Sequence, residues 1–282
     1  MIVSERHDDG GTGVAAEGGR VPGMSSQTSE WNSFMRRISR YLILVLTVTI
    51  TFSLLAAAQK IPRAKYNFNS NWKLFVGDPV GAEKADFDDS AWKNVTTPRP
   101  WNEDEAFRKD IKDLPTGIAW YRKHFKLPAG SNGKKVFLEF EGIRFGGEFF
   151  LNGKSIGRSD NGVMAFGFDI TDALVAGENV LAARIDNAWD YREKATNSTF
   201  QWNDKNFNAN YGGINKNVWL HMTDRLYQTL PLYSNLQTTG VYIYAGDIDV
   251  AKRTAFIAVE TQVKNEYPVG KNVVYEVIIQ DA

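Results

Sequence analysis

The chain has 282 residues, and its 33 lysine and arginine residues balance 33 aspartate and glutamate residues, so its net charge is zero. This balance excludes a strongly basic surface and predicts no nucleic-acid partner. The chain contains no cysteine, which excludes disulfide bonds, thiol catalysis and zinc–thiolate sites. His124 and His221 lie in strand-like runs, with no second histidine or cysteine at a ligand spacing, so we predict no metal and no cofactor.

The first 34 residues are rich in Gly, Ser and Asp and show no apolar period, so they cannot bury a core. They precede a segment that normally opens a chain. We therefore interpret residues 1–34 as disordered or as the product of a start site placed too far upstream, with Met35 or Met24 as the alternative start.

Residues 35–58 have the features of a signal peptide. Arg36, Arg37 and Arg40 precede an apolar run over 41–55, and the three alanines at 56–58 suit a signal peptidase. Arginines stay on the cytoplasmic side while the apolar run enters the bilayer, so we predict an exported protein, periplasmic or extracellular. An uncleaved membrane anchor and a buried core segment are the alternatives. The run is shorter than the roughly 20 residues that span a bilayer, which favours cleavage.

Residues 59–231 read as short β-branched or aromatic runs bounded by Gly, Asn, Asp or Pro. The clearest hairpin covers 148–157, where Asn152 and Gly153 suit the two positive φ angles of a type I′ turn. Many short strands at even spacing predict an all-β fold, here a jelly-roll sandwich.

Residues 232–282 show further alternating runs around an Asn-Glu-Tyr-Pro break, a pattern typical of an immunoglobulin-like β-sandwich. They supply fewer strands than the roughly seven that such a domain needs. We therefore expect an incomplete immunoglobulin-like sandwich, and a chain that is part of a longer protein.

The segment after residue 59 resembles the amino-terminal, galactose-binding-like jelly roll of glycoside hydrolase family 2, the family of β-galactosidases, β-glucuronidases and β-mannosidases. The aromatic-rich details are most similar to exported β-galactosidase-type members. Five stretches carry the resemblance in the expected order: FDDSAWKNVTTPRPWNEDEAF at 87–107, TGIAWYRKHFKLP at 116–128, the hairpin region at 149–174, ENVLAARIDN at 178–187 and NYGGINKNVWLHMTD at 210–224.

The resemblance implies a glycosidase whose catalytic glutamates lie on a separate (β/α)8 barrel. Retaining hydrolysis needs two opposed carboxylates about 5 Å apart, which the adjacent acids of the 103–105 loop do not offer. We therefore predict that this chain has no catalytic residue and is inactive alone. Its implied partners are a terminal β-linked sugar and the catalytic barrel. Neither the sugar nor a homo-oligomer is decided by the sequence.

The resemblance also implies sugar contacts. Asn102 lies where the family places a sugar-contacting asparagine, and its amide can donate to and accept from vicinal hydroxyls. The alternative is that Asn102 caps the acidic turn; in either case we expect Asn102→Ala to leave the fold intact.

A second contact, usually an aspartate, precedes the closing Gly-Ile pair in the family. Asp204 is the only acid in this stretch and stands farther from Gly213 than the family pattern has it. The candidacy is therefore shared by Asp204, Asn206 and Asn208. Trp202, in the same polar loop, is the best candidate for stacking on a sugar ring, with Trp101, Trp120, Trp189 and Tyr211 behind it. Trp72, Trp92 and Trp219 are expected in the core. The alternative function is a free-standing carbohydrate-binding module without catalysis.

Overall fold

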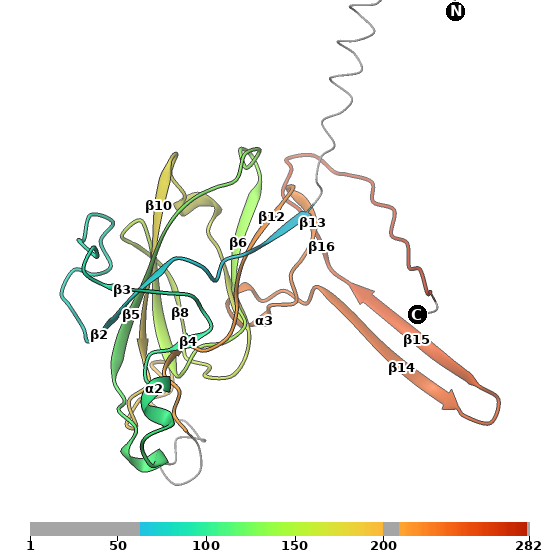
Figure 1. The fold of residues 1–282 in the computed structure, drawn as a ribbon. Helices are drawn as coiled ribbons and strands as arrows, with labels where there is room; N and C mark the ends of the chain where they lie inside the picture. The colour runs from blue at the N-terminus through green and yellow to red at the C-terminus, as the bar shows by residue number, and fades with distance from the viewer. Residues whose placement is uncertain (1–62, 200–208, 281–282) are drawn as a thin grey trace, which may run out of the picture. The chain divides into compact units, whose positions relative to one another are not determined.

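The computed structural model describes residues 63–199 and 209–280, which form a β-sandwich followed by two short ribbons (Figure 1). One sheet has four strands in the order β1-β12-β6-β9, which are Arg63–Asn67, Val218–Thr223, Lys135–Phe140 and Phe166–Asp169. The other has six strands in the order β3-β2-β5-β10-β7-β8, which are Lys93–Val95, Trp72–Val76, Ile118–Lys126, Glu178–Asp186, Gly146–Leu151 and Lys154–Ser159. Neighbouring strands in both sheets are antiparallel.

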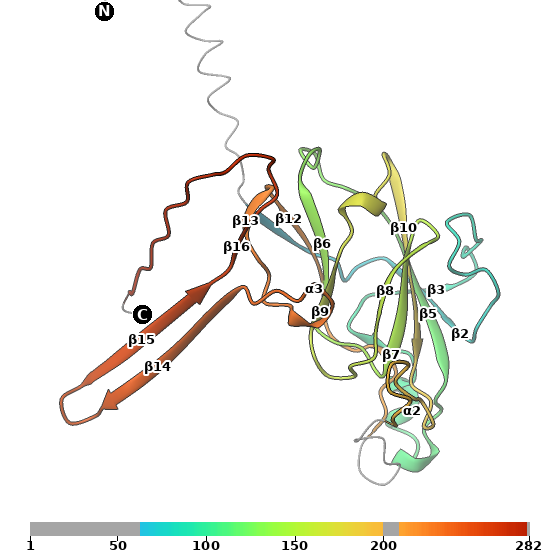
Figure 2. The ribbon, with the colours of Figure 1, turned by 180° about the vertical axis from the view of Figure 1, so that it is seen from behind.

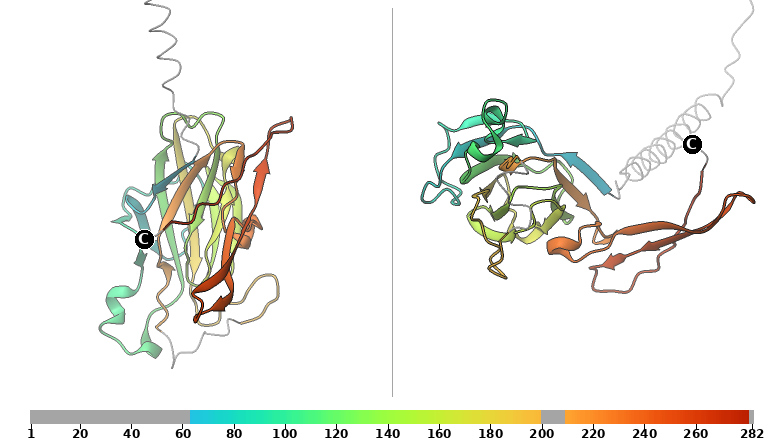
Figure 3. Two further views of the ribbon diagram at one scale, coloured as in Figure 1. Left: turned by 90° about the vertical axis from the view of Figure 1, so that its right-hand side faces the viewer. Right: turned by 90° about the horizontal axis from the view of Figure 1, so that it is seen from below.

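Phenylalanines from both sheets fill the space between them. Phe140 and Phe166 of the four-stranded sheet stack with ring centroids 5.2 Å apart, and Phe149 of the six-stranded sheet lies 4.8 Å from Phe140. All three are fully buried. Burying each such side chain stabilises the fold by roughly 2 kcal/mol, so this cluster holds the sheets together. The predicted all-β sandwich is confirmed, and Figure 3 shows it from the side and from below.

The predicted hairpin is present as β7 and β8. Asn152 and Gly153 between them both have positive φ, 53° and 80°. Asparagine and glycine adopt this conformation at little cost, so the local sequence is sufficient to set the turn. Figure 2 labels both strands of this hairpin.

A buried arginine fastens the loop after β2 onto the outer face of the six-stranded sheet. Arg122 is fully buried, and its Nε donates to Asp89 Oδ2 at 2.7 Å while an Nη1 hydrogen bond reaches the Lys84 carbonyl at 2.9 Å. A buried charge is tolerated only when it is paired, as it is here. Trp120, a stacking candidate from sequence, packs against Phe150 on this same face and is buried.

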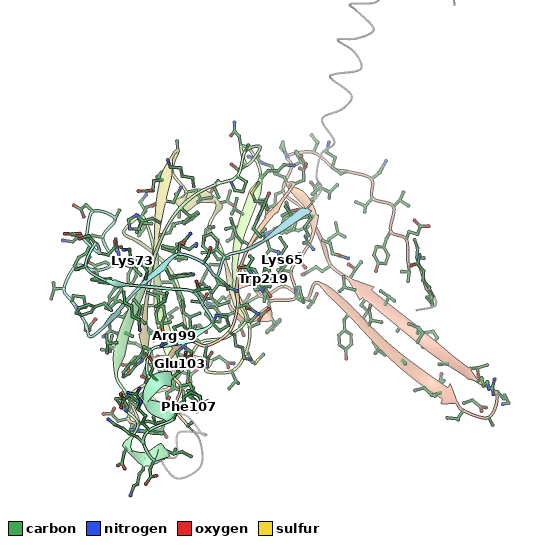
Figure 4. The ribbon with its side chains drawn as sticks, viewed as in Figure 1. Lys65, Lys73, Arg99, Glu103, Phe107 and Trp219 are labelled. Carbon is green, nitrogen blue, oxygen red and sulfur yellow. The ribbon has the colours of Figure 1, made fainter. Side chains whose placement is uncertain are left out.

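Trp219 was expected in the core but lies half-buried on the outer face of the four-stranded sheet. Alternation along β12 turns Val218 and Leu220 inward, so Trp219 between them faces outward. Its Nε1 donates to Glu141 at 2.8 Å, and Lys65 Nζ lies 4.2 Å from its ring centroid (Figure 4).

The remaining elements are short. At one end of the sandwich β4 (Arg99–Pro100) pairs with β11 (Gly213–Ile214), and α2 (Glu103–Ala106) and η1 (Ile111–Asp113) follow β4. The turn η2 (Thr171–Ala173) precedes β10 at the other end, and α3 (Tyr233–Leu236) packs on β9. No helix in the described ranges is long and apolar enough to cross a membrane.

After the sandwich, β13 (Leu226–Gln228) pairs with β16 (Val263–Asn265), and β14 (Val241–Asp249) pairs with β15 (Thr254–Thr261). Residues 268–280 form no strand, contrary to their alternating pattern, because no described segment lies beside them to complete the hydrogen bonds. The immunoglobulin-like assignment and the boundary near residue 232 stay predictions.

Candidate functional site

Asn102 ties together the loops at the β4–β11 end of the sandwich. Its side chain is 1% exposed. Nδ2 donates to the carbonyls of Pro115 and Asn210 at 2.8 and 2.7 Å, and Oδ1 accepts from the Gly212 amide at 3.0 Å. Asn102 stands at the N-cap position of α2, but its side chain makes no capping hydrogen bond to the helix. Both Nδ2 hydrogens serve the backbone, and the sugar contact of Asn102 stays a prediction.

Two further asparagines complete this arrangement. Asn187 and Asn210 are fully buried, and they are joined by hydrogen bonds from Asn187 Nδ2 to Asn210 Oδ1 at 3.2 Å and from Asn210 Nδ2 to the Asn187 carbonyl at 2.7 Å. Asn187 Oδ1 accepts from the Gly117 amide and from Trp101 Nε1 at 3.1 and 3.2 Å. Asn102, Asn187 and Asn210 are called the asparagine cluster below. Buried amides with filled hydrogen-bonding capacity fix a single loop geometry.

Next to the asparagine cluster, Gly213 of β11 lies against the side chain of Tyr121. Tyr121 OH donates to the Arg99 carbonyl at 2.6 Å, and burial raises the pKa of this phenol well above its usual range. Gly213 has a φ of 104°, and a Cβ there would stand 2.1 Å from the Tyr121 hydroxyl oxygen. Only glycine lets β11 lie this close to the Tyr121 side chain of β5.

The loop after Asn102 projects from the sandwich end and carries the densest acidic run. Arg99 forms ion pairs with Glu103 and with Asp104, the latter at 2.6 Å, so a cation of the same segment balances these acids (Figure 4). Helix α2 begins at Glu103, so all three acids of the run lie in its first turn. Phe107 at its end is 85% exposed. This loop therefore exposes one apolar side chain, Phe107, beside acids whose charge Arg99 balances.

On the other side of the asparagine cluster, Asp160 anchors the loop that follows Asn187. Its carboxylate accepts from Tyr191 OH at 2.5 Å, from Arg158 Nη2 at 2.6 Å and from the Lys194 amide at 3.1 Å. Burial opposes ionisation, yet the bonds from Arg158 and Tyr191 hold the pKa of Asp160 below its usual value. The loops on both sides of the cluster are thus held in place by polar contacts.

The other predicted contacts, Trp202, Asp204, Asn206 and Asn208, lie in 200–208, outside the described residues. Among the aromatic candidates, Trp101 packs at the edge of the core beside Asn187, and Tyr211 is 36% exposed next to Asn210. Sequence reasoning missed Asn187 and Asn210. Their only signal is an asparagine directly after an apolar strand and another directly before a Tyr-Gly-Gly turn, which is common in loops.

In the described ranges no three histidine, aspartate or glutamate side chains gather as a metal-binding group. The fold and the loop cluster define a β-sandwich of the galactose-binding-like class. Residues 103–220 match the family model described as "Glycosyl hydrolase 2 galactose-binding domain-like". The chain belongs to glycoside hydrolase family 2, of which it carries this amino-terminal domain.

Relatives and solved structures agree with this placement. A β-glucuronidase of Formosa agariphila is 39% identical over 221 residues, which is 75% of this chain and 22% of that protein. The β-galactosidase BoGH2A of Bacteroides ovatus is 30% identical over 228 residues, 78% of this chain and 24% of that protein. A solved β-glucuronidase from glycoside hydrolase family 2 superposes with a TM-score of 0.65 at 38% identity, covering 73% of this chain and 22% of its own. The chain therefore spans about a quarter or less of the length of these relatives.

Proposed function

We propose that this chain is the amino-terminal part of an exported β-glycosidase, and that the loops around the asparagine cluster complete the sugar site of a (β/α)8 barrel carried by the rest of the protein. The observation that carries the proposal is the set of three buried asparagine amides. They fix the 103–116 loop, the 210–213 segment and Asn187, from which the 188–199 loop starts, at one end of the sandwich. Rigidly held loops beside a sugar hold it in a reactive orientation.

The chemistry itself is assigned to the barrel. Hydrolysis with retention needs an acid/base and a nucleophile about 5 Å apart on opposite sides of the glycosidic bond. At the site end of the described chain, Glu103 and Asp104 follow each other in the chain and both pair with Arg99. Both acids belong to one helix start and share a single cation, so we assign the chain substrate contact and no catalytic step.

The sugar is a terminal β-linked galactose or glucuronate. The aromatic-rich sequence favours the β-galactosidase type, and the Bacteroides ovatus relative is a β-galactosidase. The Formosa agariphila relative, at higher identity, is a β-glucuronidase. These two sugars differ at C6, which carries a hydroxyl in galactose and is a carboxylate in glucuronate. Assays with a nitrophenyl glycoside of each sugar therefore separate the two possibilities.

The experiment compares this chain alone with the whole protein on nitrophenyl β-galactoside and nitrophenyl β-glucuronide. We expect no turnover by the chain alone and turnover of one substrate by the whole protein. Robust turnover by the chain alone that survives Glu103→Gln would remove the barrel from the proposal. A whole protein that lacks a barrel and turns over neither glycoside would favour the second function.

That second function is a carbohydrate-binding module that works without catalysis. The observation in its favour is that the loops around the asparagine cluster hold one another through these amides, so their geometry needs no second domain. The affinity of this chain alone for monosaccharides distinguishes the two functions. Loops that complete another domain's site offer a shallow surface, so we expect monosaccharides to bind at about 1 mM or weaker. Micromolar binding of galactose or glucuronate to this chain alone would make the binding module the better assignment.

A further inference from the structure

A pocket lies at the end of the sandwich opposite the asparagine cluster. Strand β5 begins beside Gly117, which bonds Asn187, and ends at Lys126, which lines this pocket. Nine residues of strand place the two ends about 27 Å apart. The pocket has a volume of about 980 Å³ and lies between the turn before β6, the segment between η2 and β10, and residues 225 and 266.

The pocket walls have two distinct chemistries. Leu127, Leu174 and Val175 form an apolar side, and the Val175 side chain is 49% exposed there. The turn at 131–133 contributes the polar Ser131 and Asn132. An apolar wall opposite hydrogen-bonding groups suits a sugar ring, whose C–H face is apolar and whose hydroxyls need donors and acceptors.

The charges of the pocket favour an anion. Of its four cations, Lys135 pairs with Asp169 at 2.5 Å and Glu266 at 3.0 Å, and Lys134 lies 3.4 Å from Asp224. In the part of the chain that the structure describes, Lys126 and Arg225 form no ion pair with a carboxylate, and both line the pocket.

The remaining acid, Asp172, lies on the pocket rim and forms no ion pair among the described residues. Its carboxylate can accept from a sugar hydroxyl, while the two unpaired cations can hold an acidic group.

We propose that this pocket is a binding site for an acidic oligosaccharide, separate from the site at the asparagine cluster. The apolar side takes a ring face, and Lys126 and Arg225 take a carboxylate or a sulfate ester. The volume of the pocket favours an oligosaccharide as the ligand, because a single inorganic anion would leave most of the pocket filled with water. A site at this end would hold an acidic polysaccharide away from the end that carries the asparagine cluster.

The test titrates the 282-residue chain with three tetrasaccharides, namely tetragalacturonate, a sulfated galactose tetrasaccharide and neutral β-1,4-galactotetraose, followed by calorimetry and by ¹⁵N–¹H spectra. We expect one or both acidic probes to bind at least about tenfold more tightly than the neutral one, with salt weakening the binding. The stronger of the two acidic probes distinguishes a carboxylate from a sulfate ligand. Amide shifts should concentrate at 131–133 and 174–177.

The double variant Lys126→Ala/Arg225→Ala should weaken the acidic probe by about tenfold or more. The matched control is Lys93→Ala/Lys154→Ala, which removes two exposed cations that do not line this pocket and form no ion pair in the described chain. The control should bind like the unchanged chain. Equal binding of the neutral probe, an unaffected double variant, shifts confined to 210–212, or inorganic sulfate binding as tightly as the oligosaccharide would each overturn the proposal. Since the pocket and the asparagine cluster lie at opposite ends of β5, its failure would leave the proposed glycosidase function untouched.

Discussion

Asn187 fills the space that a side chain at residue 212 would need. A Cβ built on Gly212 would lie 2.3 Å from Asn187 Cγ and Nδ2. Real side chains do not approach so closely, so the two residues require each other: the amide can reach Asn210 only because residue 212 has no side chain. The asparagine cluster is therefore packed as tightly as a hydrophobic core, although it is polar.

Gly212→Ala should displace the Asn187 amide and destabilise the sandwich end. We expect a loss of roughly 1–3 kcal/mol in unfolding free energy, the usual cost of overpacking a filled site. Gly246→Ala is the matched control, because a Cβ there meets only Phe256 at 3.9 Å. Urea unfolding of both variants measures the difference. Equal midpoints for the two variants would show that the contact has room to relax.

Asn102→Ala should also destabilise the chain, in contrast to the expectation from sequence that a loop amide supports no core. The change leaves two backbone carbonyls and one amide without their partner, at a cost of roughly 1–3 kcal/mol. Asn94→Ala, at an exposed position on β3, is the control and should change the unfolding free energy by less than about 0.5 kcal/mol.

In the proposed whole β-glycosidase, variants of the asparagine cluster separate two roles for Asn102. If Asn102 acts by positioning loops, Asn187→Ala should reduce kcat/KM about as much as Asn102→Ala does. If Asn102 touches the sugar, its substitution should cost roughly 1–3 kcal/mol more in transition-state stabilisation than that of Asn187. Steady-state kinetics of both variants, with unfolding curves as a check on folding, decides between the two.

We expect the stability of the chain to change with pH in the alkaline range, because Lys123 is buried. It lies on the core-facing side of β5 with Tyr121 and Phe125, its Nζ is 4.5 Å from the Phe68 ring centroid, and burial lowers its pKa to about 8. Below pH 8 the amine is charged in both folded and unfolded chains, so the burial penalty is fully present. Between pH 8 and 10.5 the folded chain releases this proton while the unfolded chain retains it, so stability should rise with pH in this window.

Lys123→Met removes this penalty and keeps an unbranched side chain of similar length. We expect it to stabilise the chain at neutral pH by on the order of 2 kcal/mol, less whatever the ring contacts and the hydrogen bond to the Ser70 carbonyl contribute, and to abolish the rise above pH 8. Urea unfolding at several pH values measures both effects. A parallel rise in stability for the unchanged chain and the variant would assign the pH dependence to other groups.

Export predicts a defined new amino terminus. Expressed from Met35 in a bacterial host, the chain should appear in the periplasm beginning at Gln59, after the alanines at 56–58. Ala58→Phe should block cleavage, because the peptidase requires a small residue directly before the cut. Ala57→Phe is the control and should still be cleaved. Amino-terminal sequencing reads out all three chains, and a full-length cytoplasmic product would show the export prediction wrong.

Local sequence was sufficient wherever the physics is local. Strand runs such as 118–126 and the Asn152-Gly153 turn declare themselves through alternation and through residues that adopt positive φ, so the sandwich and its hairpin could be predicted. The five motif stretches likewise identified the family. The partners of Asn102 could not be predicted, because Pro115, Asn210 and Gly212 lie up to 110 residues away in the chain and meet only when β4 pairs with β11.

The same holds for two tryptophans. Trp120 and Trp219 have similar strand-like surroundings, yet Trp120 is buried under a loop held by Arg122, whereas Trp219 faces outward beneath Lys65. Burial depends on which segment covers a sheet face, and that is a property of the tertiary structure. The sequence by itself determined the β-sandwich, the family and the residue types available for sugar contact. Only the tertiary structure decided which polar side chains are used up inside the fold and which remain at the surface, because hydrogen-bond partners are set by proximity in space and not by neighbourhood along the chain.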